Sequence, residues 1–375
     1  MDKFEMIIPT LLGVEAFVSK EVKRMGCEVS SVEDGRVCFL GDRLDLCRAN
    51  IGIRTGERVL IKIGEFKALS FTELFDNVYA LPWDEWIDKN GAFPVKGYCL
   101  KSKLASVPDC QAIIKKAVAK KLGDKYGLER MPEDGALYQI QFSIMKDRVT
   151  VMIDSSGAPL HKRGYRQNSN TAPLRETIAA AMVMLSYWKF ENPLCDPFCG
   201  SGTIPIEAAM FKRNIAPGLM RGFAAEQFMG FDAKLWENAR EWARDLARNT
   251  PLEIYASDID PMCVELTKAN ADKAGVGDLI TVERKDARKI AFERADGSII
   301  CNPPYGERMG DKKECERLYK EIGRAFEALP NWDKYILVPN EGFEGLYGRK
   351  ADKKRKIYNG MLRCNVYQYF KKVRS

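Results

Sequence analysis

The segment PLCDPFCGSGTIPIEAAMFKRN (193–214) decides the fold of the C-terminal half of the chain. It opens with a short apolar stretch typical of a buried strand, passes through a glycine-containing turn and continues into a run that favours a helix. Further strands are predicted at LEIYASDID (252–260), LITVERKDA (279–287) and DGSIICNPP (296–304), with helical segments between them. Strands that alternate with crossover helices indicate a doubly wound α/β fold built on a parallel sheet.

The last part of the chain adds an antiparallel element to this sheet. KKRKIYNGMLRCNVYQYF (353–370) contains two alternating strand-like runs around Asn359-Gly360. Asn-Gly between such runs is a strong hairpin signal. We therefore expect an antiparallel hairpin at the end of a parallel sheet.

The N-terminal part is predicted to form two small α+β units. Residues 1–40 give the order β-α-β-β, with a hairpin signal at Asp34-Gly35. Residues 60–155 contain a strongly amphipathic helix, CQAIIKKAVAKKLGDKYG (110–127), and two alternating strands around Lys146-Asp147. The polar segment HKRGYRQNSNTAPLRE (161–176) is predicted to link these units to the C-terminal domain.

Composition narrows the function classes. The 375 residues include 46% hydrophobic residues, but the longest apolar run (178–185) is too short for a membrane span, and we expect no signal peptide. Eleven cysteines without a CxxC pair and a single histidine, His161, argue against a zinc site and against His-dependent hydrolases. Free thiols suggest the reducing cytosol.

The net charge of +7 is concentrated in runs such as RKADKKRK (349–356). A run of this kind is more often a solvated face. The other interpretation is contact with nucleic acid, where each Lys or Arg replaces a counterion on phosphate. The charge alone does not separate the two interpretations.

The turn DPFCGSGT (196–203) predicts a ligand site. A dinucleotide fingerprint needs a third glycine where this chain has Pro205, so a pyrophosphate cradle is poorly supported. Asp196 at the strand end would repel an anion and suits a cation, as in the amino and sulfonium groups of S-adenosylmethionine. The alternative interpretation is an ordinary glycine turn.

Two more acids follow the next strands. Asp258 could accept hydrogen bonds from a ribose diol, and Asp286 could accept from the adenine amine. Either acid by itself is more often a helix cap or a surface charge. Three acids at three successive strand ends beside a glycine loop favour a binding site at that edge of the sheet.

The segment NPPY, which comprises Asn302, Pro303, Pro304 and Tyr305, follows the next strand at the same edge. The amide oxygen of Asn302 and the carbonyl of Pro303 could accept both hydrogens of an exocyclic amine, while Tyr305 stacks on its ring. Accepting both hydrogens returns electron density to the nitrogen and directs its lone pair at a methyl group. The alternative is a proline-rich turn after a strand.

Together these motifs resemble class I S-adenosylmethionine-dependent amino-methyltransferases. The whole chain is similar to bacterial THUMP-domain RNA methyltransferases, near the guanine-N2 half of the 23S ribosomal RNA enzyme RlmL. HKRGYR, APLRETIAAAM, DPFCGSGT, ASDID, KDAR and NPPYGERMG carry the resemblance in order. It implies a Rossmann-like class I methyltransferase domain, with a seven-stranded sheet and an antiparallel closing hairpin, at 173–375. It further implies a ferredoxin-like domain at 1–60, a THUMP RNA-binding domain at 61–155 and a linker at 156–172.

The resemblance also implies site residues. Catalysis would fall to Asn302, Pro303, Pro304 and Tyr305. The cofactor S-adenosylmethionine, with S-adenosylhomocysteine as product and no metal, would contact Thr177, Asp196, Phe198, Gly200, Gly202, Thr203, Asp258, Ile259, Asp286 and Ala287. RNA would contact Lys101, Lys103, Lys115, Lys116, Lys120, Arg163, Arg166 and Arg308.

The expected activity is methyl transfer to the exocyclic N2 amine of a guanine in structured RNA, with 23S rRNA or a ribosome-assembly intermediate ahead of tRNA. The alternatives are a tRNA guanine-N2 methyltransferase, an adenine-N6 nucleic-acid methyltransferase, and a non-catalytic RNA-binding assembly factor. We expect a cytoplasmic protein that binds no membrane. Because the chain ends at Ser375, we expect it to lack the second methyltransferase of long RlmL proteins.

Overall fold

A computed structural model describes residues 3–166, 174–189, 191–306, 311–339, 341–359 and 362–371. The chain forms two compact units. The first comprises Met1–Thr10, Ser19–Leu160 and Arg221–Trp242. The second comprises Leu11–Val18, His161–Met220 and Ala243–Ser375. Residues 221–242, which the expected division places in the C-terminal domain, thus group with the first unit. The four domain boundaries themselves stay a prediction.

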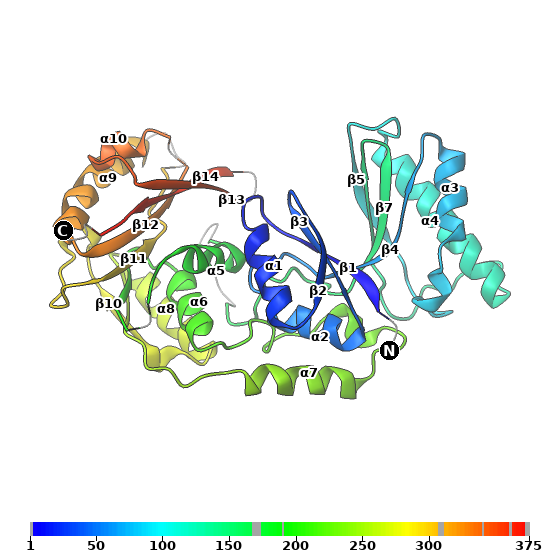
Figure 1. The fold of residues 1–375 in the computed structure, drawn as a ribbon, viewed down its shortest axis with the longest axis horizontal. Helices are drawn as coiled ribbons and strands as arrows, with labels where there is room; N and C mark the ends of the chain where they lie inside the picture. The colour runs from blue at the N-terminus through cyan, green and yellow to red at the C-terminus, as the bar shows by residue number, and fades with distance from the viewer. Residues whose placement is uncertain are drawn as a thin grey trace. The chain divides into compact units, whose positions relative to one another are not determined.

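The first unit is built on one seven-stranded sheet with the order β2-β3-β1-β4-β7-β6-β5. Its strands are β1 (Phe4–Pro9), β2 (Glu28–Glu33), β3 (Arg36–Gly41), β4 (Leu60–Lys67), β5 (Val95–Leu100), β6 (Ile140–Met145) and β7 (Arg148–Asp154). The pairs Met6↔Ile61 and Ile7↔Leu60 join β1 to β4 in antiparallel orientation. The ferredoxin-like and THUMP segments therefore share a continuous sheet (Figure 1).

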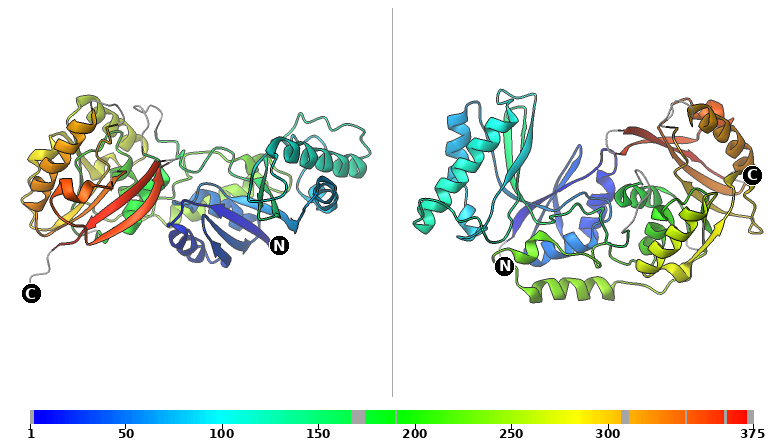
Figure 2. Two further views of the ribbon diagram at one scale, coloured as in Figure 1. Left: turned by 90° about the horizontal axis from the view of Figure 1, so that it is seen from above. Right: turned by 180° about the vertical axis from the view of Figure 1, so that it is seen from behind.

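The helices of this part of the chain are α1 (Glu15–Arg24), α2 (Arg43–Gly52), α3 (Phe71–Ala80) and α4 (Val107–Tyr126), with a 3-10 turn at Trp83–Glu85. The sequence sets both ends of α4. Ser106 caps its first turn by accepting from the Asp109 amide, and Gly127 ends it in the left-handed conformation, at φ 67°. Helices α3 and α4 lie together on one side of β4, β5 and β7 (Figures 1 and 2).

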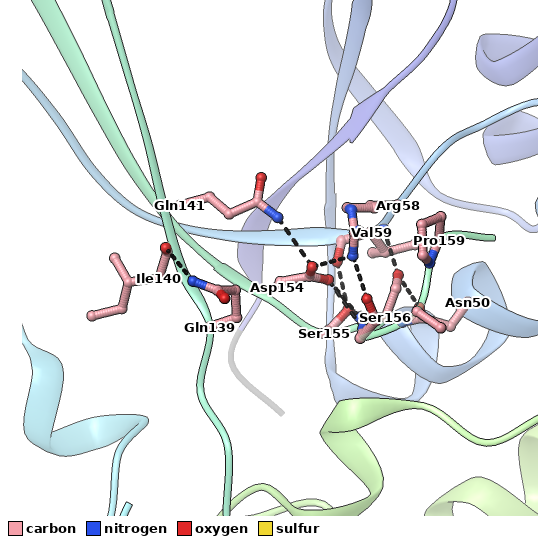
Figure 3. A network of polar contacts seen from close by, with 12 residues as sticks. Asn50, Arg58, Val59, Gln139, Ile140, Gln141, Asp154, Ser155, Ser156 and Pro159 are labelled. Carbon is pink, nitrogen blue, oxygen red and sulfur yellow. Dashed lines mark hydrogen bonds and ion pairs between the residues drawn. The ribbon is translucent and has the colours of Figure 1, made fainter. Parts of the chain in front are cut away.

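A buried polar network holds the end of β7 to α2 and to the start of β4 (Figure 3). The carboxylate of Asp154 accepts hydrogen bonds from Arg58, from Gln141 (3.0 Å) and from the Ser156 amide (2.9 Å). The Ser156 hydroxyl donates to Asn50 at 2.6 Å and accepts from the Val59 amide at 2.8 Å. Buried polar groups whose hydrogen bonds are all made favour a single arrangement of the chain. This network therefore holds the end of β7 and the start of β4 in one position.

The second unit contains another seven-stranded sheet, with the order β10-β9-β8-β11-β12-β14-β13. Its strands are β8 (Leu194–Asp196), β9 (Ile254–Asp258), β10 (Ile280–Arg284), β11 (Gly297–Cys301), β12 (Trp332–Val338), β13 (Lys353–Asn359) and β14 (Leu362–Tyr369). Strands β8 to β12 pair in parallel, and β14 is antiparallel to both β12 and β13. The predicted fold class, a parallel sheet closed by an antiparallel hairpin, is confirmed.

The remaining helices are α5 (Glu176–Leu185), α6 (Thr203–Lys212), α7 (Ala233–Asp245), α8 (Pro261–Lys273), α9 (Asp311–Glu327) and α10 (Phe343–Tyr347). Apolar side chains of α5 and α6 form one core with β8 and β9, and those of α9 form another with β11 and β12. None of the described helices is long and apolar enough to cross a membrane. Strand order reverses at β8, which has β9 on one side and β11 on the other, and such a switch point opens a crevice at the carboxyl ends of the strands.

Candidate functional site

A cleft of about 930 Å³ lies at the carboxyl ends of β8, β9 and β11, as the switch point predicts. The polar residues that follow successive strands, Asp196, Asp258, Asp286 and Asn302, all line it. Among the other predicted cofactor residues, it is also lined by Phe198, Gly200, Thr203, Ile259 and Ala287. The parallel sheet thus brings together residues that are far apart in the sequence.

The turn after β8 depends on glycine and on helix α8. Gly200 and Gly202 both have positive φ, at 53° and 82°. A side chain at Gly202 would approach the Thr267 methyl group to 2.9 Å. Thr267 donates to the Gly200 carbonyl at 3.0 Å, and Asn270 donates to the Ser201 carbonyl at 2.9 Å. Sequence reasoning missed these two α8 side chains, because a polar position on a crossover helix gives no local signal of its contact.

Asp196 is a buried carboxylate that lines the cleft, with 1% of its surface exposed. One oxygen accepts from the Phe198 amide at 3.0 Å. Burial raises its pKa well above the usual value, and the nearby Asp258 adds to the effect. In the part of the chain that the structure describes, no Lys or Arg forms an ion pair with it. A ligand with a cationic group would relieve this cost.

Asp258 supports the turn as well as facing the cleft. Its carboxylate accepts from the Gly200 amide and from the Asp260 amide, both at 3.0 Å. A carboxylate has about four acceptor positions, so capacity for a diol remains. The exposed side chain of Ile259 adds an apolar surface beside it.

Asp286 is already engaged. Its carboxylate accepts from the Arg288 amide at 3.0 Å and from the guanidinium of Arg288 at 2.6 to 2.9 Å, and Arg288 also contacts Glu321 at 3.1 Å. The hydrogen bonds from Arg288 lower the pKa of Asp286. A ligand amine at this carboxylate would have to share it with Arg288 or displace the guanidinium.

Within NPPY, the contacts divide unevenly. Asn302 and Pro304 line the cleft, whereas Pro303 and Tyr305 are not among its lining residues. The Tyr305 hydroxyl donates to the Asn302 amide oxygen. The Tyr319 hydroxyl of α9 donates to the Pro304 carbonyl at 2.7 Å, so this carbonyl already has a partner within the protein.

Helix α9 forms a wall of the cleft that the sequence did not reveal. The sequence predicts a crossover helix there without assigning it to the site, since charged residues on a crossover helix usually belong to a solvated face. The lining residues from this helix are Lys313, Glu314, Cys315, Arg317, Leu318 and Glu321. Two predicted cofactor residues do not line the cleft: Thr177 is fully buried inside α5, and Gly202 lies within the turn.

The predicted RNA-binding lysines differ in their environments. Lys101, Lys103, Lys116 and Lys120 are exposed, and Lys115 is half-buried. On α4, Lys115 forms an ion pair with Glu133 and Lys120 forms one with Asp124. Part of the charge of that helix is therefore neutralised within the protein.

The predicted RNA contact of Arg163 is wrong. Its side chain is buried, at 2% exposure, and its guanidinium pairs with the buried Glu207 at 3.2 Å, so RNA cannot reach it. Arg166 is mostly buried as well: it pairs with Glu176 at 2.9 Å and donates to Thr203 at 3.2 Å. The segment 161–176 was predicted to be a linker because its sequence does not show the ion pairs that its arginines form with Glu176 and Glu207. Arg308 lies outside the described residues.

No group of three or more His, Cys, Asp or Glu side chains among the described residues could hold a metal ion. The cleft fits a cofactor with a cationic end and a diol, because Asp196 supplies a buried carboxyl group without an ion pair to any described Lys or Arg, and Asp258 keeps acceptor positions open.

Family models match almost the whole chain. The RMKL-like methyltransferase domain matches residues 163–368, the RlmL ferredoxin-like domain matches 5–60, and the THUMP domain matches 68–154. These matches confirm the resemblance inferred from the sequence.

Relatives and solved structures agree with the family matches. The chain is 47% identical to the "Putative RNA methyltransferase YpsC" of Bacillus subtilis, over 100% of this chain and 98% of that one. It is 33% identical to the ribosomal RNA large subunit methyltransferase K/L of Psychromonas ingrahamii, over 96% of this chain and 49% of that protein.

Two crystal structures share the fold over nearly their full length. One is that of a "predicted N6-adenine-specific DNA methylase" from Listeria monocytogenes, with TM-score 0.94, 45% identity and coverage of 99% of this chain and 97% of that one. The other is SMU.472 complexed with SAH, with TM-score 0.93, 39% identity and complete coverage of both chains. The protein therefore belongs to the RMKL-like methyltransferase family, with its methyltransferase domain preceded by an RlmL ferredoxin-like domain and a THUMP domain.

Proposed function

We propose that the protein transfers a methyl group from S-adenosylmethionine to the exocyclic N2 amine of a guanine in 23S ribosomal RNA, in the cytoplasm. The observation that carries the proposal is the meeting of Asp196, Asp258 and Asn302 in one cleft at the strand ends. This combination supplies a carboxylate for a cation, acceptors for a diol and an acceptor for an amine. The THUMP domain favours RNA as the substrate, and the likeness to the K/L ribosomal enzyme favours rRNA.

The cofactor would be held by the residues that follow β8 and β9. When bound, S-adenosylmethionine supplies a methyl group activated by a sulfonium. The Asp196 carboxylate offsets the positive charge of the methionyl end, and Asp258 accepts from the ribose hydroxyls. Gly200 lines the cleft and carries no side chain, so the backbone there can approach a ligand closely.

The substrate amine would be held by NPPY. Asn302 accepts one amine hydrogen and the Pro303 carbonyl accepts the other, which raises the electron density on the nitrogen. In this structure the Tyr305 hydroxyl donates to the Asn302 oxygen, so an incoming amine shares that oxygen with the hydroxyl or displaces it. Displacement would free the tyrosine ring to stack on the base. A base in a duplex must first leave its stack, which costs a few kcal/mol unless it is already unpaired.

A second candidate is adenine-N6 methylation, which the name given to the similar Listeria protein favours. NPPY accepts the hydrogens of any planar exocyclic amine, so the motif alone does not choose between guanine and adenine. An RNA-binding front end argues against a DNA substrate. A tRNA guanine and a purely RNA-binding role are the remaining alternatives.

The test uses tritiated S-adenosylmethionine with RNA and with DNA from a strain that lacks the gene. We expect label in RNA only. Asn302→Ala should abolish transfer while S-adenosylhomocysteine binding changes little, and Asn77→Ala at a half-buried position of α3 serves as the matched control. Label in DNA, or undiminished transfer by Asn302→Ala, would overturn the proposal.

A further inference from the structure

The sheet of the first unit carries exposed side chains on one face at the THUMP end. Cys99 of β5 contacts Cys110 of α4, with 3.9 Å between the sulfur atoms, so this strand position points toward the helices. Side chains alternate between the two faces of a strand, and the positions on either side of Cys99 therefore point away from α4. These are Tyr98 and Leu100.

The strand register extends this face across the sheet. Tyr98 pairs with Ser143 of β6, which pairs with Thr150 of β7. In the next cross-strand row, Leu100 pairs with Met145, which pairs with Arg148 of β7, which pairs with Lys67 of β4. Directly paired residues share a face. The open sheet face is defined here by Lys67, Lys96, Tyr98, Leu100, Ser143, Met145 and Arg148.

Its centre is aromatic and apolar. Tyr98 is 53% exposed, Leu100 49% and Met145 41%. The Tyr98 hydroxyl reaches the sulfur of Met145 on the neighbouring strand at 3.6 Å, whereas the small Ser143 between them is buried. The tyrosine ring therefore extends across β6 along the sheet, with its other side open to solvent.

Positive charge surrounds this centre. Arg148 is exposed, and its ion pair with Glu65 at 2.7 Å leaves the guanidinium at the surface. Lys67 and Lys96 on the face, and Lys101 and Lys103 in the turn after β5, are exposed. Within the described ranges, none of these lysine side chains forms an ion pair. On the opposite side of the sheet, by contrast, Lys115, Lys120 and Lys125 of α4 all pair with carboxylates.

We propose that the open sheet face binds an unpaired segment of the RNA substrate, with a base stacked on Tyr98 and phosphates near Lys96, Lys101 and Lys103; this inference rests on the proposed RNA substrate. An exposed aromatic ring accepts any base face, and the surrounding cations suit a polyanion. Unpaired bases are free to leave the stack and lie on a sheet, whereas a duplex keeps its bases inside. The surface therefore selects single-stranded RNA over duplex.

The experiment compares two labelled RNA probes by fluorescence anisotropy, without cofactor. One is a hairpin with a single-stranded 3′ tail of about 10 nucleotides, within the size that one module covers. The other is the same hairpin with a blunt end. Tyr98→Ala should weaken binding of the tailed probe by about 5- to 150-fold, the range of alanine substitutions at stacking residues, and should leave the blunt probe unchanged. Tyr98→Phe keeps the ring and should bind as the wild type does.

Two further variants separate stacking from charge. Lys96→Ala should reduce the salt slope for the tailed probe by about 0.7, whereas Tyr98→Ala should leave that slope unchanged. Phe71→Ala, which removes a 39% exposed aromatic ring from α3, is the matched control and should have no effect. Equal weakening of both probes by Tyr98→Ala, or no weakening of either, would overturn the proposal.

Crosslinking covers the case in which Tyr98→Ala does not fold. Wild-type protein is irradiated with a tailed probe that carries 4-thiouridine. Crosslinks on β5 and β6 support the proposal, and crosslinks confined to α4 overturn it. These binding experiments do not depend on catalysis. If the protein binds the tailed probe through Tyr98 but never methylates RNA, only the proposed function is overturned, and the RNA-binding role of the open sheet face stands.

Discussion

Asp196 is a buried acid whose replacement should raise stability and lower cofactor affinity at the same time. In the free protein the folded state favours its protonated form, because burial opposes the charge. The usual pKa of the group is 3.8, and the folded-state pKa lies well above it. Between these two values the unfolded chain has lost the proton that the folded chain keeps. The free energy of unfolding therefore falls as pH rises, by up to about 1.4 kcal/mol per pH unit from this group.

Asp196→Asn removes that dependence. The amide keeps an oxygen for the Phe198 amide, 3.0 Å away in the wild type, and carries no charge to bury. We expect the variant to be more stable than the wild type, by a margin that grows with pH until the folded-state pKa is passed. Urea unfolding at several pH values measures the margin. The exposed Asp76→Asn on α3 is the control and should show no such trend.

Cofactor binding should change in the opposite direction. A cationic ligand favours the ionised carboxylate, so binding to the wild type releases a proton from Asp196 and tightens as pH rises. Loss of a hydrogen bond to a charged group costs about 1.5–3 kcal/mol, which weakens binding of S-adenosylmethionine by about 10- to 150-fold. Calorimetry in two buffers of different ionisation enthalpy measures both the affinity and the proton release.

Equal affinity of the variant and the wild type for S-adenosylmethionine would refute this role of Asp196. If the difference in free energy of unfolding between the variant and the wild type does not change with pH, burial does not raise the pKa of Asp196 as argued.

Three smaller predictions concern neighbouring contacts. Arg163→Met removes the ion-pair partner of the buried Glu207 and should lower the free energy of unfolding by about 3–5 kcal/mol. The dependence of RNA affinity on salt concentration should not change, and a weaker dependence would mean that Arg163 does contact RNA. Tyr305→Phe keeps the ring but frees the Asn302 oxygen, and should lower the KM for RNA by about 2- to 12-fold, whereas a higher KM would mean that the hydroxyl itself contacts RNA. Arg288→Ala releases Asp286 and should tighten cofactor binding, so weaker binding in calorimetry would argue against Asp286 as an acceptor.

The sequence predicted best which residues meet at one edge of the second sheet. Asp196, Asp258 and Asn302 each follow a predicted strand, and parallel strands bring such ends to one edge. The antiparallel pairing of β13 with β14 was predictable from the Asn359-Gly360 signal, since two-residue turns have strong local residue preferences, although residues 360 and 361 lie outside the described ranges.

Contacts between distant segments were not predictable. The continuous sheet of the first unit depends on the pairing of β1 with β4, and the register between strands separated by two helices and a hairpin leaves no local pattern. Arg163 was predicted to contact RNA, and its ion pair was missed because Glu207, its buried partner, lies 44 positions further along the chain. The hydrogen bonds from Arg288 to Asp286 were missed because the sequence does not show whether an acid at the end of a strand is free or is paired with a nearby arginine.

The most direct measurement of the central claim is nucleoside mass spectrometry of 23S rRNA and tRNA from a strain that lacks the gene, before and after incubation with the purified protein and S-adenosylmethionine. We expect N2-methylguanosine to be absent from one position of the 23S rRNA and to return after incubation. The appearance of N6-methyladenosine instead, or of new methyl groups only in tRNA, would contradict guanine-N2 methylation of 23S rRNA.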